Sequence, residues 1–268
     1  MIVLYALVAL LGLAIGSFLN VVVWRVPQGM SLTHPPSACP RCQHPIRARD
    51  NVPVVSWLLL RGRCRDCGEP ISARYPLVEL VTGVLFVLTA VWTGLEPPGV
   101  WALPAYLYLV SIGVALTLID LDVHRLPNAI VLPAWVVAPA LLAVAAAGTG
   151  EWDRLVRALL GGVVLFLFYG FVHYGSRLVY GRSGGIGLGD VKLAFVLGTY
   201  LGWSGWGALA VGAFAAFLVG TVFWVVLLAA GKAGRKTQIP FGPWMIIGAG
   251  IGIVWGQQAW DAWTGLWL

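Results

Sequence analysis

The chain has 268 residues, of which 59% are hydrophobic and only 10% are charged, and its mean hydropathy is +0.86. Soluble domains carry about 25% charged residues, so this composition excludes a soluble globular protein and predicts repeated membrane crossings. The formal net charge of +6 does not indicate nucleic-acid binding, because the basic residues are not spread over a soluble face. Eight of the 17 Lys and Arg residues lie between Arg25 and Arg74 instead.

Apolar runs long enough to cross a membrane follow one another along the chain. No basic segment precedes the first run, and Arg25 follows it, so we expect a retained span rather than a cleaved signal peptide. The predicted fold class is an all-α polytopic membrane protein with a first span at 1–24, a polar domain at 25–75 and a bundle of about seven spans at 76–268. The eight expected spans are 2–24, 76–93, 100–119, 128–148, 155–180, 190–204, 206–230 and 243–260.

Basic residues in the short loops predict the orientation. If the polar domain is cytoplasmic, the other inside loops hold Arg125, Arg177, Arg182, Lys232, Arg235 and Lys236. The outside loops then hold Glu96, Glu151 and Asp153, with Arg154 and Arg157 as exceptions, and this asymmetry satisfies the positive-inside rule. Six tryptophans near the predicted outside boundaries are expected to be interface anchors: Trp92, Trp101, Trp152, Trp203, Trp206 and Trp260.

The polar domain contains two CxxC pairs, Cys39 with Cys42 and Cys64 with Cys67. Two such knuckles present four thiolates to one ion and predict a tetrahedral zinc site. A disulfide is disfavoured in a reducing cytoplasm. Because four sulfurs leave no open coordination position, we expect the zinc to be structural. His34 and His44 lie nearby and are alternative ligands, although exposed loop histidines are the more ordinary interpretation.

Two aspartates stand at the boundaries of apolar runs. Asp120 ends one run, and Asp190 follows Gly187-Leu188-Gly189 and begins another. A carboxylate at hydrocarbon depth costs about 2.5 kcal/mol or more, so it is rarely placed there without a function. Two carboxyls that share one proton can activate water and polarise a carbonyl, as in aspartic proteases. We therefore predict that Asp120 and Asp190 converge on one hydrolytic centre.

Other interpretations of these residues remain open. Either aspartate could be a helix-end residue in headgroup water, and Asp190 would favour the N-terminus of its helix through the helix dipole. Asp122 competes with Asp120, although it lies beside His124 and Arg125 and is expected to be solvated or paired. A proton- or cation-coupled transporter would also use carboxylates, but at the bilayer midplane and with inverted repeats. A zinc-ribbon adaptor with a membrane anchor would leave Asp190 without a purpose.

With these residues in view, the chain resembles the type IV prepilin peptidases, also called prepilin leader peptidase/N-methyltransferases, of the GxGD aspartic protease group. One departure is Asn128, where many members carry Asp, at a position that we take to be non-catalytic. The resemblance rests on motifs along nearly the whole chain: Gly16–Val22 with Arg25–Pro27, both CxxC pairs, Asp50–Pro53, Ile71–Glu79, Ile119-Asp120 with Leu126–Asn128, Gly187–Lys192 and Ile239–Pro243.

The resemblance implies cleavage of the basic leader of type IV prepilins or pseudopilins at the cytoplasmic face of the bacterial inner membrane. It assigns Asp120 and Asp190 as the catalytic pair and the four cysteines as metal ligands. It also implies S-adenosylmethionine as a cofactor for methylating the new N-terminus, and substrates and membrane lipid as partners. The methyl-transfer activity follows from the resemblance alone, since no Rossmann-like glycine motif is present. Glu79, a charged residue just inside the second span, is the candidate to hold the substrate amine, and an interfacial glutamate is the alternative interpretation.

Overall fold

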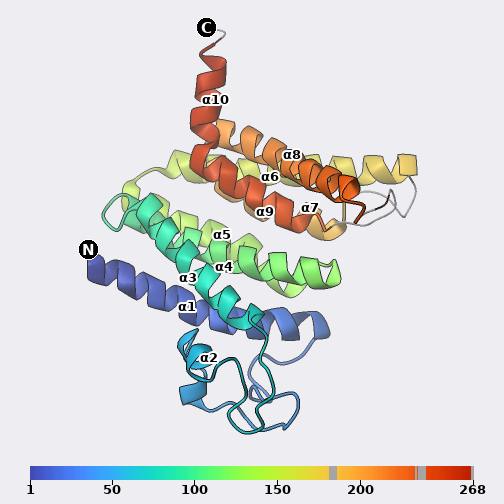
Figure 1. Cartoon of the computed structure of the whole chain (residues 1–268). Helices are drawn as coiled ribbons and strands as arrows, with labels where there is room; N and C mark the ends of the chain where they lie inside the picture. Colours follow the sequence, from blue (N-terminus) through green and yellow to red (C-terminus); the bar gives the residue numbers. More distant parts are fainter. Residues whose placement is uncertain (181–185, 233, 235–239, 267–268) are drawn as a thin grey trace. The chain divides into compact units, whose positions relative to one another are not determined.

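The computed structural model describes residues 1–180, 186–232, 234 and 240–266, and helices dominate it (Figure 1). The expected all-α class is confirmed. Four residues of the sequence analysis lie outside the described residues: Arg182, Arg235, Lys236 and Ile239. The helices are α1 (Ile2–Arg25), α2 (Val55–Leu59), α3 (Arg74–Thr93), α4 (Gly99–Val123), α5 (Asn128–Thr149), α6 (Trp152–Tyr180), α7 (Leu188–Ser204), α8 (Trp206–Ala229), α9 (Gly242–Ile251) and α10 (Gln257–Thr264).

The chain divides into two compact units, Met1–Leu118 and Ile119–Leu268, which are described separately. In the part of the chain that the structure describes, six helices are long and apolar enough to cross a membrane: α1, α3, α4, α5, α6 and α8. The two other expected spans are also helical. One is α7, and the other runs from α9 through a π-helical turn at Gly252–Gly256 into α10.

Helix α7 is short because protein, rather than lipid, surrounds most of it. It has 17 residues, near the lower limit for a membrane span, and Asp190, Val191 and every residue from Leu193 to Trp203 except Phe195 are buried. It packs along α6 and also contacts α5, α8 and α9. A helix that is apolar on all sides and enclosed by neighbours is a core helix. Asp190 therefore lies at the end of the central helix of its unit.

Small residues bring the helices of each unit unusually close. In α1, Gly12 and Gly16 face α3, and a Cβ added to Gly16 would lie 2.7 Å from the Cα of Glu79. In α7, a Cβ added to Gly198 would lie 2.5 Å from the carbonyl oxygen of Gly161 in α6. Glycines four residues apart allow such backbone contact between membrane helices. This packing explains part of the chain's 34 glycines.

In the second unit, the C-terminal end of α7 packs against two arginines of α6. Trp203 is only 1% exposed, so it is a core residue rather than an interface anchor, while the other five boundary tryptophans are exposed. The guanidinium of Arg154 lies 4.6 Å from the Trp203 ring centroid. Arg157 Nε donates to the carbonyl oxygen of Gly202 at 2.9 Å. Both arginines therefore satisfy the C-terminal end of α7, which accounts for their exception to the charge asymmetry.

In the first unit, two similar turns follow α1. An isolated bridge joins Ala38 to Pro45, and a second joins Arg63 to Pro70. Each bridge closes a tight loop that carries one CxxC pair. The short helix α2 lies between the two loops, and Trp57 Nε1 donates to the carbonyl oxygen of Ile71 at 3.0 Å. The segment between α1 and α3 thus holds itself together mainly through turns and hydrogen bonds.

Candidate aspartate centre and metal site

Asp120 lies in the last turn of α4 and is 5% exposed. Its Oδ2 accepts a hydrogen bond from the backbone N–H of Gly242 at 3.0 Å. Gly242 begins α9, 122 positions along the chain, and a Cβ added there would lie 2.8 Å from the same oxygen. The late Pro240–Pro243 segment therefore contributes a backbone donor to the aspartate, and only glycine leaves room for that contact.

Asp190 is the third residue of α7 and is 8% exposed. Its Oδ2 accepts a hydrogen bond from the backbone N–H of Gly187 at 2.9 Å, at the N-cap position of the same helix. This is the return contact of a helix-capping acid, and it also places a carboxylate at the positive end of the helix dipole. Asp190 therefore does cap the N-terminus of α7, which was one of the interpretations that the sequence left open, and this contact orients its carboxylate.

The two aspartates are brought together, although they lie 70 positions apart in the sequence. Their carboxylates are near enough to repel each other electrostatically. Leu126 lies between Gly189, which precedes Asp190, and Gly242, which donates to Asp120. A Cβ added to Gly189 would lie 3.0 Å from Leu126 Cβ, and one added to Gly242 would lie 3.2 Å from Leu126 Cδ2. The end of α4, the start of α7 and the start of α9 thus meet at one place.

Burial separates the two acids that competed in the sequence. Asp120 is buried, whereas Asp122 is exposed. Both buried carboxylates lie near helix ends rather than at the middle of a span, which differs from the midplane placement that a transporter would need. Two buried carboxyls that repel each other favour a state in which only one is ionised, and such a pair can act as acid and base.

Neighbouring side chains fix the start of α7. Lys192 Nζ donates to Asn128 Oδ1 at 2.9 Å, so it is directed at α5. Trp135 Nε1 donates to the backbone carbonyl of Lys192 at 3.0 Å, and its ring stacks on Phe195 with centroids 4.4 Å apart. Asn128, the one departure from the family pattern, thus has a defined partner. It ties the first residue of α5 to the helix that carries Asp190.

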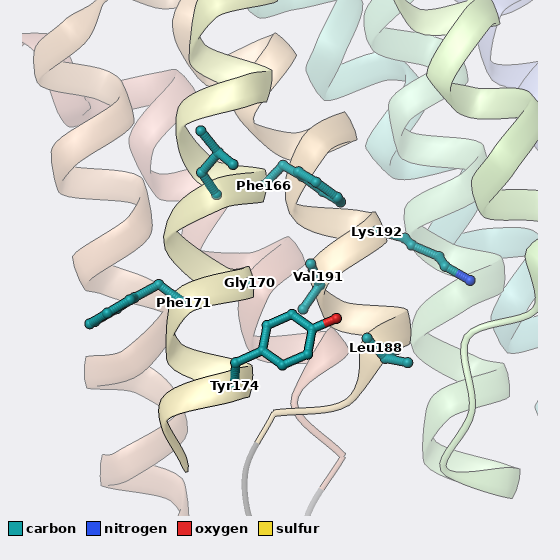
Figure 2. Close-up of a pocket in the computed structure, with 8 residues that line it drawn as sticks. Phe166, Gly170, Phe171, Tyr174, Leu188, Val191 and Lys192 are labelled. Atoms are coloured by element: carbon teal, nitrogen blue, oxygen red, sulfur yellow. The ribbon is translucent and has the colours of Figure 1, made fainter. Parts of the chain in front are cut away.

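An apolar cavity of about 380 Å³ lies between α6 and α7, beside the second aspartate (Figure 2). Figure 2 shows the Tyr174 ring reaching toward Leu188 and Val191, while Lys192 points away. Among the residues that the structure describes, the cavity lining contains no carboxylate. Its walls are Phe166, Leu167, Gly170, Phe171, Tyr174, Leu188, Val191 and Lys192.

The four cysteines meet in the first unit, and their sulfurs all lie within 4.8 Å of one another. Cys39 Sγ is 3.7 Å from Cys67 Sγ, and Cys42 Sγ is 4.0 Å from Cys64 Sγ. Sulfurs at about 2.3 Å from a tetrahedral zinc are separated by about 3.8 Å, so this cluster fits such an ion. The distances also exclude disulfides. In the part of the chain that the structure describes, His34 and His44 do not belong to the cluster.

The metal-free cluster resists full ionisation. Backbone N–H groups of Cys42 and Arg41 stabilise one thiolate and lower the pKa of Cys39 to about 7. The N–H of Glu69 acts in the same direction at Cys67, but desolvation and the three other thiols outweigh it and raise the pKa of Cys67 to about 12. Four thiolates so close together need a cation to neutralise them, and a bound dication supplies that charge.

Ion pairs reinforce this part of the chain. Each of its three acids pairs with an arginine: Arg41 with Glu69, Arg47 with Asp66, and Arg65 with Asp50. The Arg65 guanidinium donates to both oxygens of Asp50 and lowers the pKa of that carboxyl. These acids are therefore engaged within their own unit.

Glu79 lies in the second turn of α3 and is 9% exposed. Its Oε2 accepts a hydrogen bond from the backbone N–H of Val54 at 2.7 Å. Val54 has φ +62°, a strained conformation for a β-branched residue, and it precedes α2. Glu79 thus anchors the loop between the two cysteine knuckles to a membrane helix.

Sequence reasoning missed two supports of the aspartates, Gly242 and Leu126, together with the contact that His173 makes to the loop before α7. The Nδ1 of His173 bonds the backbone carbonyl oxygen of Ile186. A glycine between Pro240 and Pro243 was the available signal for Gly242, because glycine lets the backbone come close to another group.

Comparisons with known proteins agree with the motifs. Residues 10–93 match the family described as "Bacterial Peptidase A24 N-terminal domain", and residues 107–229 match the "Type IV leader peptidase family". Two curated relatives named "Prepilin leader peptidase/N-methyltransferase" are each 38% identical to the chain. The protein from Aeromonas salmonicida aligns over 95% of this chain and 91% of its own length, and that from Pseudomonas aeruginosa over 93% and 89%. No solved structure gives a significant match.

Proposed function

The chain belongs to the type IV leader peptidase family, and we propose that it is a membrane aspartic endopeptidase that removes the basic leader of type IV prepilins or pseudopilins. Its relatives carry the names of both a peptidase and a methyltransferase. The observation that supports the aspartic mechanism most strongly is the meeting of two buried, mutually repelling carboxylates at the ends of membrane helices.

In this proposal, Asp120 and Asp190 share one proton. The ionised carboxyl takes a proton from water as the water attacks the scissile carbonyl, and the neutral carboxyl polarises that carbonyl. Proton donation to the leaving amine completes cleavage. Close like charges in a region of low dielectric favour the singly ionised pair, which is the state that this reaction needs.

The backbone donors from Gly187 and Gly242 hold the two carboxylates in place. Each donor occupies one Oδ2 and leaves the opposite oxygen of the carboxylate for water or substrate. Because both donors are main-chain groups at helix starts, they orient the acids without adding a titratable group. A shift of about 1 Å in such an arrangement costs about a hundredfold in rate.

We assign the four cysteines to a structural zinc ion. Four thiolates would complete its coordination, so the ion would stabilise the fold of the segment between α1 and α3 and would supply no catalytic water. We place this segment and the aspartates on the cytoplasmic side of the bacterial inner membrane, because that orientation satisfies the positive-inside rule. The scissile bond of a prepilin, between a basic leader and an apolar helix, would lie at that surface.

The decisive experiment uses purified protein, a prepilin substrate and S-adenosylmethionine, with the product's N-terminus analysed by mass spectrometry. Leader loss is expected with the wild type and must disappear in Asp120→Asn and in Asp190→Asn, which preserve size and remove the ionisable group. Full cleavage by either variant would refute the aspartic mechanism.

We also propose N-methylation of the new N-terminus by the same chain, with Glu79 holding the substrate amine. The described residues contain no strand–loop–helix element of the kind that binds nucleotides in Rossmann folds. The assignment therefore depends on the burial and charge of Glu79, whose Oε2 is already engaged by Val54.

Two substitutions separate the roles of Glu79. Glu79→Gln keeps an oxygen that accepts from the Val54 N–H but removes the charge, whereas Glu79→Ala removes both. If the amine binds Glu79, the glutamine variant should cleave prepilin normally and lose methylation. Normal methylation by Glu79→Gln, with impaired folding only in Glu79→Ala, would leave Glu79 a purely structural anchor.

A further inference from the structure

The peptide group between Ile186 and Gly187 is hydrogen-bonded on both sides. Its carbonyl oxygen accepts from His173 Nδ1, and its N–H donates to Asp190 Oδ2 at 2.9 Å. His173 comes from α6 and is 5% exposed. One rigid, planar peptide unit therefore lies between a buried histidine and a buried aspartate.

The contacts define the histidine's tautomer. A backbone carbonyl oxygen only accepts, so Nδ1 of His173 must carry the hydrogen. Nε2 is then the acceptor in a neutral ring, and Arg177 Nη1 lies 3.4 Å from it, one helical turn further along α6. The guanidinium is always charged. The result is a directed series of hydrogen bonds in which Arg177, His173 and the Ile186–Gly187 peptide each donate to the next group, and which ends at the accepting carboxylate of Asp190.

Hydrogen bonds in such a series polarise one another. A donor on the peptide carbonyl makes the N–H of the same peptide a stronger donor, by about 10–30% per bond in condensed phase. A stronger donor to a carboxylate favours its ionised form. The cation at the far end acts in the same direction. The geometry thus supplies both a position and an electrostatic bias for Asp190.

We propose that His173 and Arg177 are positioning residues that act on Asp190 through the Ile186–Gly187 peptide. They touch no substrate in this scheme. His173 holds the carbonyl and so fixes the direction in which Gly187 donates, while Arg177 orients the imidazole. The proposal rests on the peptidase function proposed above, and it names what prepares one of the two carboxylates for that reaction.

The other charged and titratable groups around Asp190 act separately. Asp120 of α4 repels it, and Tyr169 of α6 interacts with it electrostatically. Lys192, on its own helix, is directed at Asn128 instead. From α9 the nearby Gly242 contributes only a backbone donor, which goes to Asp120. Among the residues that the structure describes, Arg177 and His173 of α6 are connected to Asp190 by hydrogen bonds through the Ile186–Gly187 peptide.

The test compares His173→Leu with His173→Asn in the full-length protein, using prepilin cleavage as a function of pH. The asparagine amide places an N–H near the position of Nδ1, so it can restore the bond to the carbonyl. Ser176→Ala is the matched control, because Ser176 Oγ donates only to the backbone carbonyl of His173 at 2.9 Å and does not touch the ring.

We expect His173→Leu to lower kcat about tenfold or more, with little change in KM, and to move the acidic limb of the pH–rate profile to higher pH. His173→Asn should recover most of both effects, Arg177→Gln should show a smaller shift in the same direction, and Ser176→Ala should match the wild type. An unchanged acidic limb in His173→Leu, or no recovery in His173→Asn, would overturn the proposal.

A second measurement does not depend on activity. Hydrogen exchange of the peptide containing Gly187 to Asp190 should be faster in His173→Leu and should return toward the wild-type rate in His173→Asn. If the wild type cleaves no prepilin, the peptidase function fails, while exchange still decides whether His173 holds this peptide group. Equal exchange in all variants would overturn the positioning role itself.

Discussion

The cysteine cluster and the aspartate centre both hold like-charged groups close together, but they do so by opposite means. The cysteines span 28 positions, and two similar turns with local hydrogen bonds bring them into contact. The aspartates lie 70 positions apart in the sequence, and the packing of α7 on α9, together with the hydrogen bond from Gly242 of α9 to Asp120, brings them together. A metal ion can neutralise the first set, whereas the proposed mechanism requires the second set to keep one shared proton.

Because of this difference, we expect mutations at the two sites to have different consequences. If the cysteine knuckles bind the proposed zinc ion, damage there should appear first as lost metal and lost local order. At the aspartates, the scaffold consists of helices that pack without the acids. Damage there should appear as lost rate in a protein that remains folded. The predictions below test that division.

The largest expected effect follows removal of the metal ligands. Cys64→Ser combined with Cys67→Ser should abolish binding of the ion, because structural zinc sites contribute about 10–16 kcal/mol at neutral pH. The segment between the knuckles should then become sensitive to trypsin, with metal content measured in parallel by mass spectrometry. His44→Ala is the control, since His44 lies outside the sulfur cluster. Loss of metal in that variant would return the histidine to the ligand set.

The next effect concerns the acids themselves. Asp190→Asn should lower kcat about a thousandfold or more, equivalent to about 4 kcal/mol, because the variant has no carboxylate to accept the proton of water. Its metal content and thermal stability should stay close to those of the wild type. Asp122→Asn, which changes an exposed acid two residues after Asp120, should retain most of the activity. Equal losses in the two variants would remove the distinction based on burial.

The comparison also explains what could be predicted from the sequence. Spacing within one short segment predicted the cysteine site, and apolar periodicity predicted the helices. The flanking prolines single out Gly242, but its partner could not be predicted, because the contact depends on the start of α9 meeting Asp120 across 122 positions. Trp203 was misjudged for a similar reason. Its place near a span boundary suggested lipid contact, whereas packing of α7 against the arginines of α6 buries it. Remote helix packing leaves no local pattern.

Gly242→Ala tests the packing that places Asp120. The new Cβ would lie 2.8 Å from Asp120 Oδ2, so the carboxylate or the start of α9 must shift. We expect kcat to fall about a hundredfold, which is the typical cost of a displacement of about 1 Å. Gly250→Ala is the matched control in α9, because its added Cβ would have no neighbour within 4 Å. Similar losses in both variants would indicate a general helix effect rather than a contact with Asp120.

The smallest effect isolates the turn geometry of the cysteine knuckles. Gly68 follows Cys67 with φ +71°, as Gln43 follows Cys42 with φ +59°. An alanine at position 68 would meet no atom within 4 Å, so only the left-handed backbone opposes it, at a cost of about 1–2 kcal/mol. Metal affinity, measured by competition with a chelator, should therefore fall about tenfold. Gly29→Ala carries the same backbone cost at φ +67°, outside the knuckles, and should leave the affinity unchanged. If Gly68→Ala retains full affinity, metal binding rather than the local turn determines the positions of the thiolates, and the contrast with the helix-packed aspartates becomes weaker.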